Sequence, residues 1–219
     1  TLDNERQGHR PPLKAMNDRQ ADYIASIMTN QQTISMGCAG TGKTFIAATV
    51  AADLYRNRKI KKIVLTRPNV AASKSLGYFK GTLEDKIGPW VVPFTSVIQD
   101  RLGPAVYDIA MKRGEIEIVP FEVMRGRTFD NAFVILDEAQ NTDPSEMKLF
   151  LTRIGQGSKV IINGDIAQSD LKQASGLLKI VNMIKRQMLP IPIIEFTEDD
   201  IVRSDICAMW IRAFHRENL

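Results

Sequence analysis

The sequence predicts an α/β fold in which a mostly parallel central sheet is flanked by helices. Short runs rich in β-branched residues alternate with longer segments of helical apolar spacing, the pattern of parallel βαβ units. Several runs are apolar on consecutive residues, which indicates strands buried on both faces. The first run leads into a glycine-rich loop and a helical pattern. The expected strands are Thr33-Ile34-Ser35-Met36, Lys62-Ile63-Val64-Leu65-Thr66, Phe133-Val134-Ile135-Leu136, Lys159-Val160-Ile161-Ile162 and Ile191-Pro192-Ile193-Ile194.

Two helix starts are marked by capping residues. Thr142-Asp143-Pro144 combines capping side chains with a proline suited to a first helical turn. Ser204-Asp205 precedes a second pattern with apolar residues three or four apart on one helix face. These residues are Ile206, Met209, Trp210 and Ala213.

The length predicts one domain over residues 17–219, after a polar, flexible lead-in at residues 1–16. At about 150 residues per domain, 219 residues are too few for two nucleotide-binding folds of about 200 residues each. Residues 76–114 contain five glycines and three prolines, so we expect an insertion of helices and loops there. The sequence shows no internal repeat.

Charge and cysteine content narrow the functional classes. The net charge of +4 allows nucleic acid as a partner without requiring it. Cys38 and Cys207 lack the spacing of a zinc site or a disulfide framework, which indicates a reducing compartment. No apolar run reaches the roughly 18 residues needed to span a bilayer, and the N-terminus lacks a secretory core. We therefore expect a cytoplasmic protein that does not enter a membrane.

A phosphate-binding loop is the strongest motif. Gly37-Cys38-Ala39-Gly40-Thr41-Gly42-Lys43-Thr44 fits the pattern GxxxxGK[ST], follows a strand and opens a helix. Backbone N–H groups of such a loop bind phosphate oxygens, Lys43 reaches the β and γ phosphates, and the Thr44 hydroxyl binds Mg²⁺. The alternative is a glycine-rich turn without a ligand, and this strand–loop–helix context favours a phosphate site.

Two carboxylates follow a later apolar run. Asp137 at the end of a buried strand would hold Mg²⁺, while Glu138 would orient and deprotonate the attacking water. The alternative is a strand with a solvated acidic end. Together with the phosphate loop, the pair predicts a nucleoside triphosphatase.

From Asn17 to about Phe214 the chain resembles the PhoH family, P-loop ATPases related to superfamily 1 helicase motor domains. The resemblance implies a RecA-like sheet with the strand order 5-1-4-3-2, in which the strand ending at Gly164 lies between the other two site strands. Besides the phosphate loop, it rests on Asn17-Asp18-Arg19-Gln20, Thr66-Arg67-Pro68, Gly81-Thr82-Leu83-Glu84-Asp85-Lys86, Met124-Arg125-Gly126-Arg127-Thr128-Phe129, Asp137-Glu138-Ala139-Gln140-Asn141 and Gly164-Asp165-Ile166-Ala167-Gln168.

The resemblance also implies roles for four polar residues. Gln20 is similar to the adenine reader, Gln168 to the sensor of the γ-phosphate and water, and Gln140 to a relay between that sensor and the carboxylates. Arg203 is similar to an arginine finger, although Ser204 stands where the family often has histidine. The alternatives are a surface residue for Gln20, ordinary loop polarity for Gln140 and Gln168, and a salt bridge to the preceding acidic run for Arg203.

The resemblance implies that copies of the chain assemble. One motor domain leaves the second half of a helicase-type site missing, so a ring of identical subunits, most naturally a hexamer, would complete it with Arg203 acting across the boundary. Trp90, Trp210 and Phe214 are expected in the core or in such an interface. Residues 1–36 are too few for the nuclease domain that some members carry.

Nucleic acid is the expected partner of the motor. The basic bias at residues 56–86 also fits a solvated helix end, so it is not specific by itself. The candidate contacts for RNA or single-stranded DNA are Arg67, Lys80, Lys86, Arg125 and Arg127.

The sequence thus predicts a cytoplasmic, Mg²⁺-dependent ATPase that oligomerises and couples hydrolysis to RNA or single-stranded DNA. One alternative is a nucleotide-gated binding or assembly protein that acts on a protein partner. A small-molecule kinase is a second alternative, but Glu138 and Gln168 argue against it because that pair positions water.

Overall fold

A six-stranded, wholly parallel sheet forms the centre of the computed structural model, which describes residues 10–68, 83–121, 124–169 and 174–217. The strand order is β3-β2-β4-β5-β1-β6. The predicted order of five strands is confirmed, and Ile116–Ile118 adds an edge strand that was not predicted. The strands are β1 (Gln32–Met36), β2 (Lys62–Thr66), β3 (Ile116–Ile118), β4 (Ala132–Leu136), β5 (Lys159–Gly164) and β6 (Ile193–Glu195).

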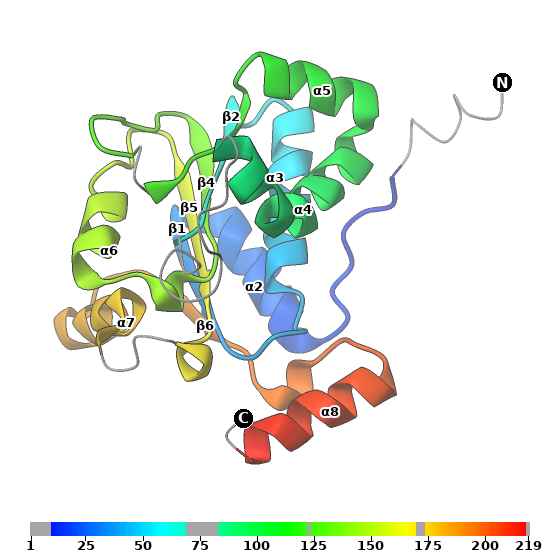
Figure 1. The fold of residues 1–219 in the computed structure, drawn as a ribbon, viewed down its shortest axis with the longest axis vertical. Coiled ribbons are helices and arrows are strands. Elements are labelled where there is room, and N and C mark those ends of the chain that lie inside the picture. Colours follow the sequence, from blue (N-terminus) through cyan, green and yellow to red (C-terminus); the bar gives the residue numbers. More distant parts are fainter. Residues whose placement is uncertain (1–9, 69–82, 122–123, 170–173, 218–219) are drawn as a thin grey trace, which may run out of the picture.

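Helices cover both faces of the sheet (Figure 1). One face carries α2 (Asp18–Thr29), α3 (Lys43–Arg56), α4 (Leu83–Leu102) and α5 (Pro104–Lys112). The opposite face carries α6 (Pro144–Leu151) and α7 (Gly176–Gln187), and α8 (Asp205–Arg216) lies at the lower end of the view. Within the described residues, short 3₁₀ helices include η3 (Ala139–Asn141), η4 (Ile166–Gln168) and η6 (Glu198–Asp200).

Two hydrophobic clusters pack against opposite faces of the sheet. Phe133 and Ile135 of β4 join the cluster beneath α2, α3 and α4, whereas Val134 and Leu136 join the cluster beneath α6 and α7. All four are fully buried. This alternation explains the consecutive apolar residues, because successive side chains of a strand point to opposite faces.

The predicted starts of α6 and α8 are confirmed. Asp143 caps α6 by accepting hydrogen bonds from the backbone N–H groups of Ser145 and Glu146, and Glu146 bonds back to the Asp143 N–H. Pro144 occupies the first turn, where a missing N–H costs nothing. The helix α8 begins at Asp205, directly after Ser204.

The segments at the ends of the predicted domain are partly described. Residues 10–16 have no regular secondary structure, but Leu13 packs against the core and the Pro11 carbonyl accepts a 2.6 Å bond from Arg101. Residues 1–9 lie outside the described residues. Within the expected insertion, Arg101 of α4 binds both oxygens of Asp53 on α3 at 2.7 Å, while residues 76–82 are not described.

One face of α8 is exposed and apolar. Trp210 and Phe214 stack with ring centroids 5.7 Å apart, and their exposed fractions are 55% and 48%. Ile206 and Met209 are exposed beside them in the helical pattern. Trp210 and Phe214 therefore lie outside the core of the described residues, and their place in a subunit interface stays a prediction. The side chain of Trp90 lies outside the described residues.

Candidate nucleotide-binding site

The phosphate loop joins β1 to α3 at the carboxyl edge of the sheet. Gly42 precedes Lys43, the first residue of α3, and its φ of 87° is a left-handed conformation that a side chain would strain. A Cβ atom at Gly37 would lie 2.1 Å from the carbonyl oxygen of Phe196, so only glycine fits there. The loop therefore has the strained turn and the helix start that phosphate binding requires.

Lys43 holds the loop together from within. Its ammonium group donates to the carbonyl oxygens of Gly37 at 2.6 Å and Cys38 at 2.7 Å. Burial lowers the pKa of Lys43, while the carboxylates of Asp165 and Asp137 oppose that shift. The ammonium thus lies in a partly desolvated position where it can interact strongly with a phosphate.

Thr44 and Asp137 meet across the site. The Thr44 hydroxyl lies 3.4 Å from Oδ1 of Asp137, which is 8% exposed at the end of β4. Burial and the neighbouring Glu138 raise the pKa of Asp137 to about 6. A hydroxyl beside a buried carboxylate is an oxygen donor pair that suits Mg²⁺, so the residues fit this cation.

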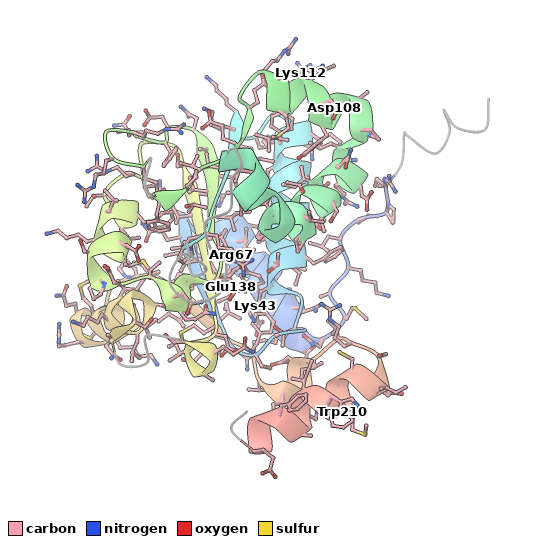
Figure 2. All side chains as sticks on the ribbon, in the orientation of Figure 1. Lys43, Arg67, Asp108, Lys112, Glu138 and Trp210 are labelled. Atoms are coloured by element: carbon pink, nitrogen blue, oxygen red, sulfur yellow. The ribbon has the colours of Figure 1, made fainter. Side chains whose placement is uncertain are left out.

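Glu138 is held between an arginine and an amide. Oε1 of Glu138 lies 3.6 Å from Nη2 of Arg67, and Oε2 accepts a 2.7 Å hydrogen bond from Gln140. The backbone of Glu138 is left-handed, with φ of 53° and ψ of 37°. Such a conformation is rare for a residue other than glycine and is typical of functional sites. Figure 2 labels Glu138 and Arg67 near Lys43.

Asp165 is a site residue to which the sequence analysis gave no role. It follows β5, is 8% exposed, and its Oδ2 atom has no hydrogen-bond partner among the described residues. Its backbone N–H donates to Gln140 at 3.0 Å. The signal was present in the sequence, because Asp165 occupies the first position after a buried strand, as Asp137 does.

The remaining predicted residues lie around the loop at different depths. Gln20 is buried and donates to the Thr41 carbonyl at 2.9 Å, and its amide oxygen accepts from the backbone of Met16. Gln168 is exposed in η4, after β5. Arg203 is exposed, with its Cγ atom 3.0 Å from where a Cβ atom of Gly40 would lie. Arg203 therefore lies against the phosphate loop of its own chain.

The candidate nucleic-acid contacts differ in their exposure and in their partners within the chain. Arg127 forms an ion pair with Glu117 and lies over the ring of Phe129. Its guanidinium therefore already has partners within the chain. Arg125 is exposed in a turn. Lys80 and the side chain of Lys86 lie outside the described residues. Arg67 lies 3.6 Å from the carboxylate of Glu138, a candidate catalytic residue.

The fold and the site together point to the class of P-loop NTPases, with a phosphate loop after β1 and an acidic strand end at β4. The family model of PhoH-like proteins matches residues 12–215, and the chain belongs to this family. A PhoH-like protein of Bacillus subtilis is 45% identical over 201 residues, covering 91% of this chain and 63% of its own length. Protein PhoH of Escherichia coli K12 is 39% identical over 207 residues, covering 93% and 58%.

The chain spans about three fifths of the length of these relatives. A crystal structure of the Pif1 helicase from Candida albicans aligns over 84% of this chain and 41% of the helicase, with 13% identity and a TM-score of 0.39.

Within the described residues, every helix is too short or too polar to cross a membrane.

Proposed function

We propose that this chain binds ATP with Mg²⁺ and hydrolyses the nucleotide. The observation that carries the proposal is the convergence of Lys43, Thr44, Asp137 and Glu138 at the end of a phosphate loop. A loop that only turned the chain would not need a hydroxyl beside a buried carboxylate. The partly exposed carboxylate of Glu138 next to them supports water as the acceptor of the phosphoryl group.

Each residue then has a distinct task. Backbone N–H groups of the phosphate loop and the Lys43 ammonium bind the phosphates. Thr44 and Asp137 hold Mg²⁺, which supplies positive charge to the phosphate oxygens. Glu138 takes the proton of the attacking water, Gln168 senses that water, and Gln140 links the two regions. The remaining roles are adenine recognition for Gln20 and stabilisation of the γ-phosphate for Arg203.

ATP hydrolysis is proposed to be coupled to RNA or single-stranded DNA in the cytoplasm. The proposed assembly is a ring of identical subunits, most naturally a hexamer. The exposed apolar face of α8 supports self-assembly, since contiguous apolar side chains on a surface mark interaction sites. The basic side chains of Arg67 and Arg125 support a polyanionic partner.

The same face of α8 favours one competing function. A nucleotide-gated binding or assembly protein would use Trp210 and Phe214 to hold a protein partner and would turn over slowly. Such a protein would not respond to nucleic acid.

The decisive experiment is the ATPase rate with and without RNA and single-stranded DNA, across a range of protein concentrations. We expect Mg²⁺-dependent turnover that nucleic acid stimulates. The dependence of the rate per subunit on protein concentration reports whether ring formation contributes to the site. An ATPase rate that nucleic acid leaves unchanged would favour the competing function. Absence of both ATP binding and turnover would overturn the ATPase itself.

A further inference from the structure

Arg67 and Glu138 form an ion pair beside the phosphate loop (Figure 2). The two residues follow neighbouring parallel strands, β2 and β4, whose last paired residues are Thr66 and Leu136. About a third of each side chain is exposed, so solvent and an incoming ligand can reach the pair. The candidate general base is therefore in contact with a residue that sequence analysis assigned to nucleic acid.

The pair restrains the carboxylate of Glu138. One oxygen faces the Arg67 guanidinium and the other accepts from Gln140 at 2.7 Å. A general base must direct a lone pair at the proton that it removes. While Oε1 faces the guanidinium, it is not available to a water molecule at the γ-phosphate, whereas the bond from Gln140 to Oε2 fixes the orientation of the carboxylate.

The restraint is weak enough to be exchanged. A partly exposed ion pair at 3.6 Å is stabilised little in water and is screened by salt. A phosphodiester carries a full negative charge, and its two oxygens match the planar guanidinium in a bidentate geometry. A backbone phosphate can thus replace Glu138 as the partner of Arg67.

A basic pocket of about 460 Å³ lies between the turn at Arg125 and helix α6. The hydroxyl of Thr66, next to Arg67, contacts the sulfur of Met124, next to Arg125. Arg125 lines the pocket together with Lys148 and Arg153 of the α6 region.

The pocket has the polarity of a phosphate site. Arg153 Nε is buried and has no hydrogen-bond partner within the described part of the chain. The carboxylate in the wall, Glu146, accepts from the Asp143 backbone at 2.8 Å as part of the α6 cap. Three cations against one capped carboxylate favour an anion.

We propose that single-stranded nucleic acid lies in the pocket of Arg125, Lys148 and Arg153 and places a backbone phosphate on Arg67, which releases Glu138 to act on water. Arg67 is in this view a positioning residue that transmits nucleic-acid binding to the catalytic carboxylate. The inference rests on the proposed ATPase function and states how nucleic acid would stimulate it.

The test compares the basal and the RNA-stimulated kcat of Arg67→Ala. Basal turnover should rise about two- to fivefold, the range that a partly exposed ion pair allows. Saturating single-stranded RNA should then add little. Arg67→Lys keeps a cation and should retain a low basal rate with partial stimulation. Lys112→Ala, on α5 at the top of Figure 2 and away from Arg67 in the centre, should match the wild type in both rates.

The pocket is tested separately from Arg67. Arg125→Ala combined with Lys148→Ala should raise the RNA concentration for half-maximal stimulation while the maximal stimulated kcat stays at the wild-type value. The slope of log affinity against log salt should fall by about 1 for each cation removed. A pocket variant with unchanged RNA affinity would remove the pocket from the proposal.

The outcomes separate this inference from the proposed function. Wild-type basal turnover in Arg67→Ala, with weaker RNA binding only, would make Arg67 a simple phosphate contact and overturn the inference. Loss of basal turnover in both Arg67 variants would also overturn it, because Arg67 would then assist catalysis. A wild-type protein that hydrolyses ATP without any response to RNA would refute the coupling but leave the ATPase intact.

Discussion

Gln140 joins Glu138 to the end of the neighbouring strand β5. Its amide nitrogen donates to Glu138 Oε2 at 2.7 Å, and its amide oxygen accepts from the backbone N–H of Asp165 at 3.0 Å. The side chain is 1% exposed, so both bonds are shielded from water. A fixed amide between two strand ends supports a link between the carboxylate and the segment that contains Gln168.

Gln140→Ala should therefore impair both stability and turnover. It leaves the buried Asp165 N–H without an acceptor, which costs about 1–3 kcal/mol of unfolding free energy. Glu138 also loses one of its two donors, so we expect kcat to fall about tenfold or more through misplacement of the base. Chemical denaturation and steady-state kinetics would measure the two effects. Gln187→Ala, at the exposed end of α7, is the matched control, and equal behaviour of the two variants would remove Gln140 from the site.

Lys43→Ala should weaken ATP binding and turnover together. The ammonium is one charge-assisted donor to the phosphates, and such bonds contribute about 1.5–3 kcal/mol, or roughly tenfold to a hundredfold in affinity. Nucleotide titration by calorimetry would give the affinity, with the exposed Lys59→Ala as a charge-matched control. Wild-type affinity in Lys43→Ala would mean that the loop from Gly37 is not the phosphate site.

Glu138→Gln should separate binding from chemistry. The amide keeps the shape of the side chain but is a far poorer base, so ATP affinity should survive while kcat falls by about 10²-fold or more. Binding and turnover should be measured on the same preparation. Near wild-type turnover would mean that Glu138 is not the general base. Another group, such as Gln168, would then have to position the attacking water.

The central part of the fold was predictable because its signals are local. Consecutive apolar residues such as Phe133 to Leu136 mark strands buried on both faces, and the strand order followed from the family resemblance. The edge strand β3 was not predictable, because the alternation Ile-Glu-Ile covers only three residues and is too short to indicate a strand.

The site was predictable residue by residue but not in its contacts. Glu138 and Arg67 are 71 positions apart in the sequence, and only the register of β2 against β4 brings them together. The exposure of Trp210 was also hidden, since a helical apolar pattern looks the same whether the face meets a core or solvent.

Arg203 lies against the phosphate loop of its own chain, whereas the sequence predicted that it acts across a subunit boundary. The backbone N–H of Val202 donates to the Gly40 carbonyl at 3.0 Å, and the stem of Arg203 packs beside the same glycine. The segment therefore crosses the phosphate loop of its own chain. This position favours action of Arg203 in the site of its own subunit over action across a boundary.

Arg203→Ala should lose about 10³-fold in turnover while still binding ATP, which is the scale for an arginine that completes a phosphoryl-transfer site. Mixing this variant with Glu138→Gln then locates the arginine. If Arg203 serves its own subunit, no site in the mixture holds both an intact carboxylate and an intact arginine, so activity stays at the sum of the two variants. If it serves a neighbour, mixed assemblies contain some complete sites and activity partly returns. Subunit exchange must be demonstrated by labelled mixing. We expect no recovery of ATPase activity. Recovery after confirmed exchange would show that Arg203 acts in the site of a neighbouring subunit.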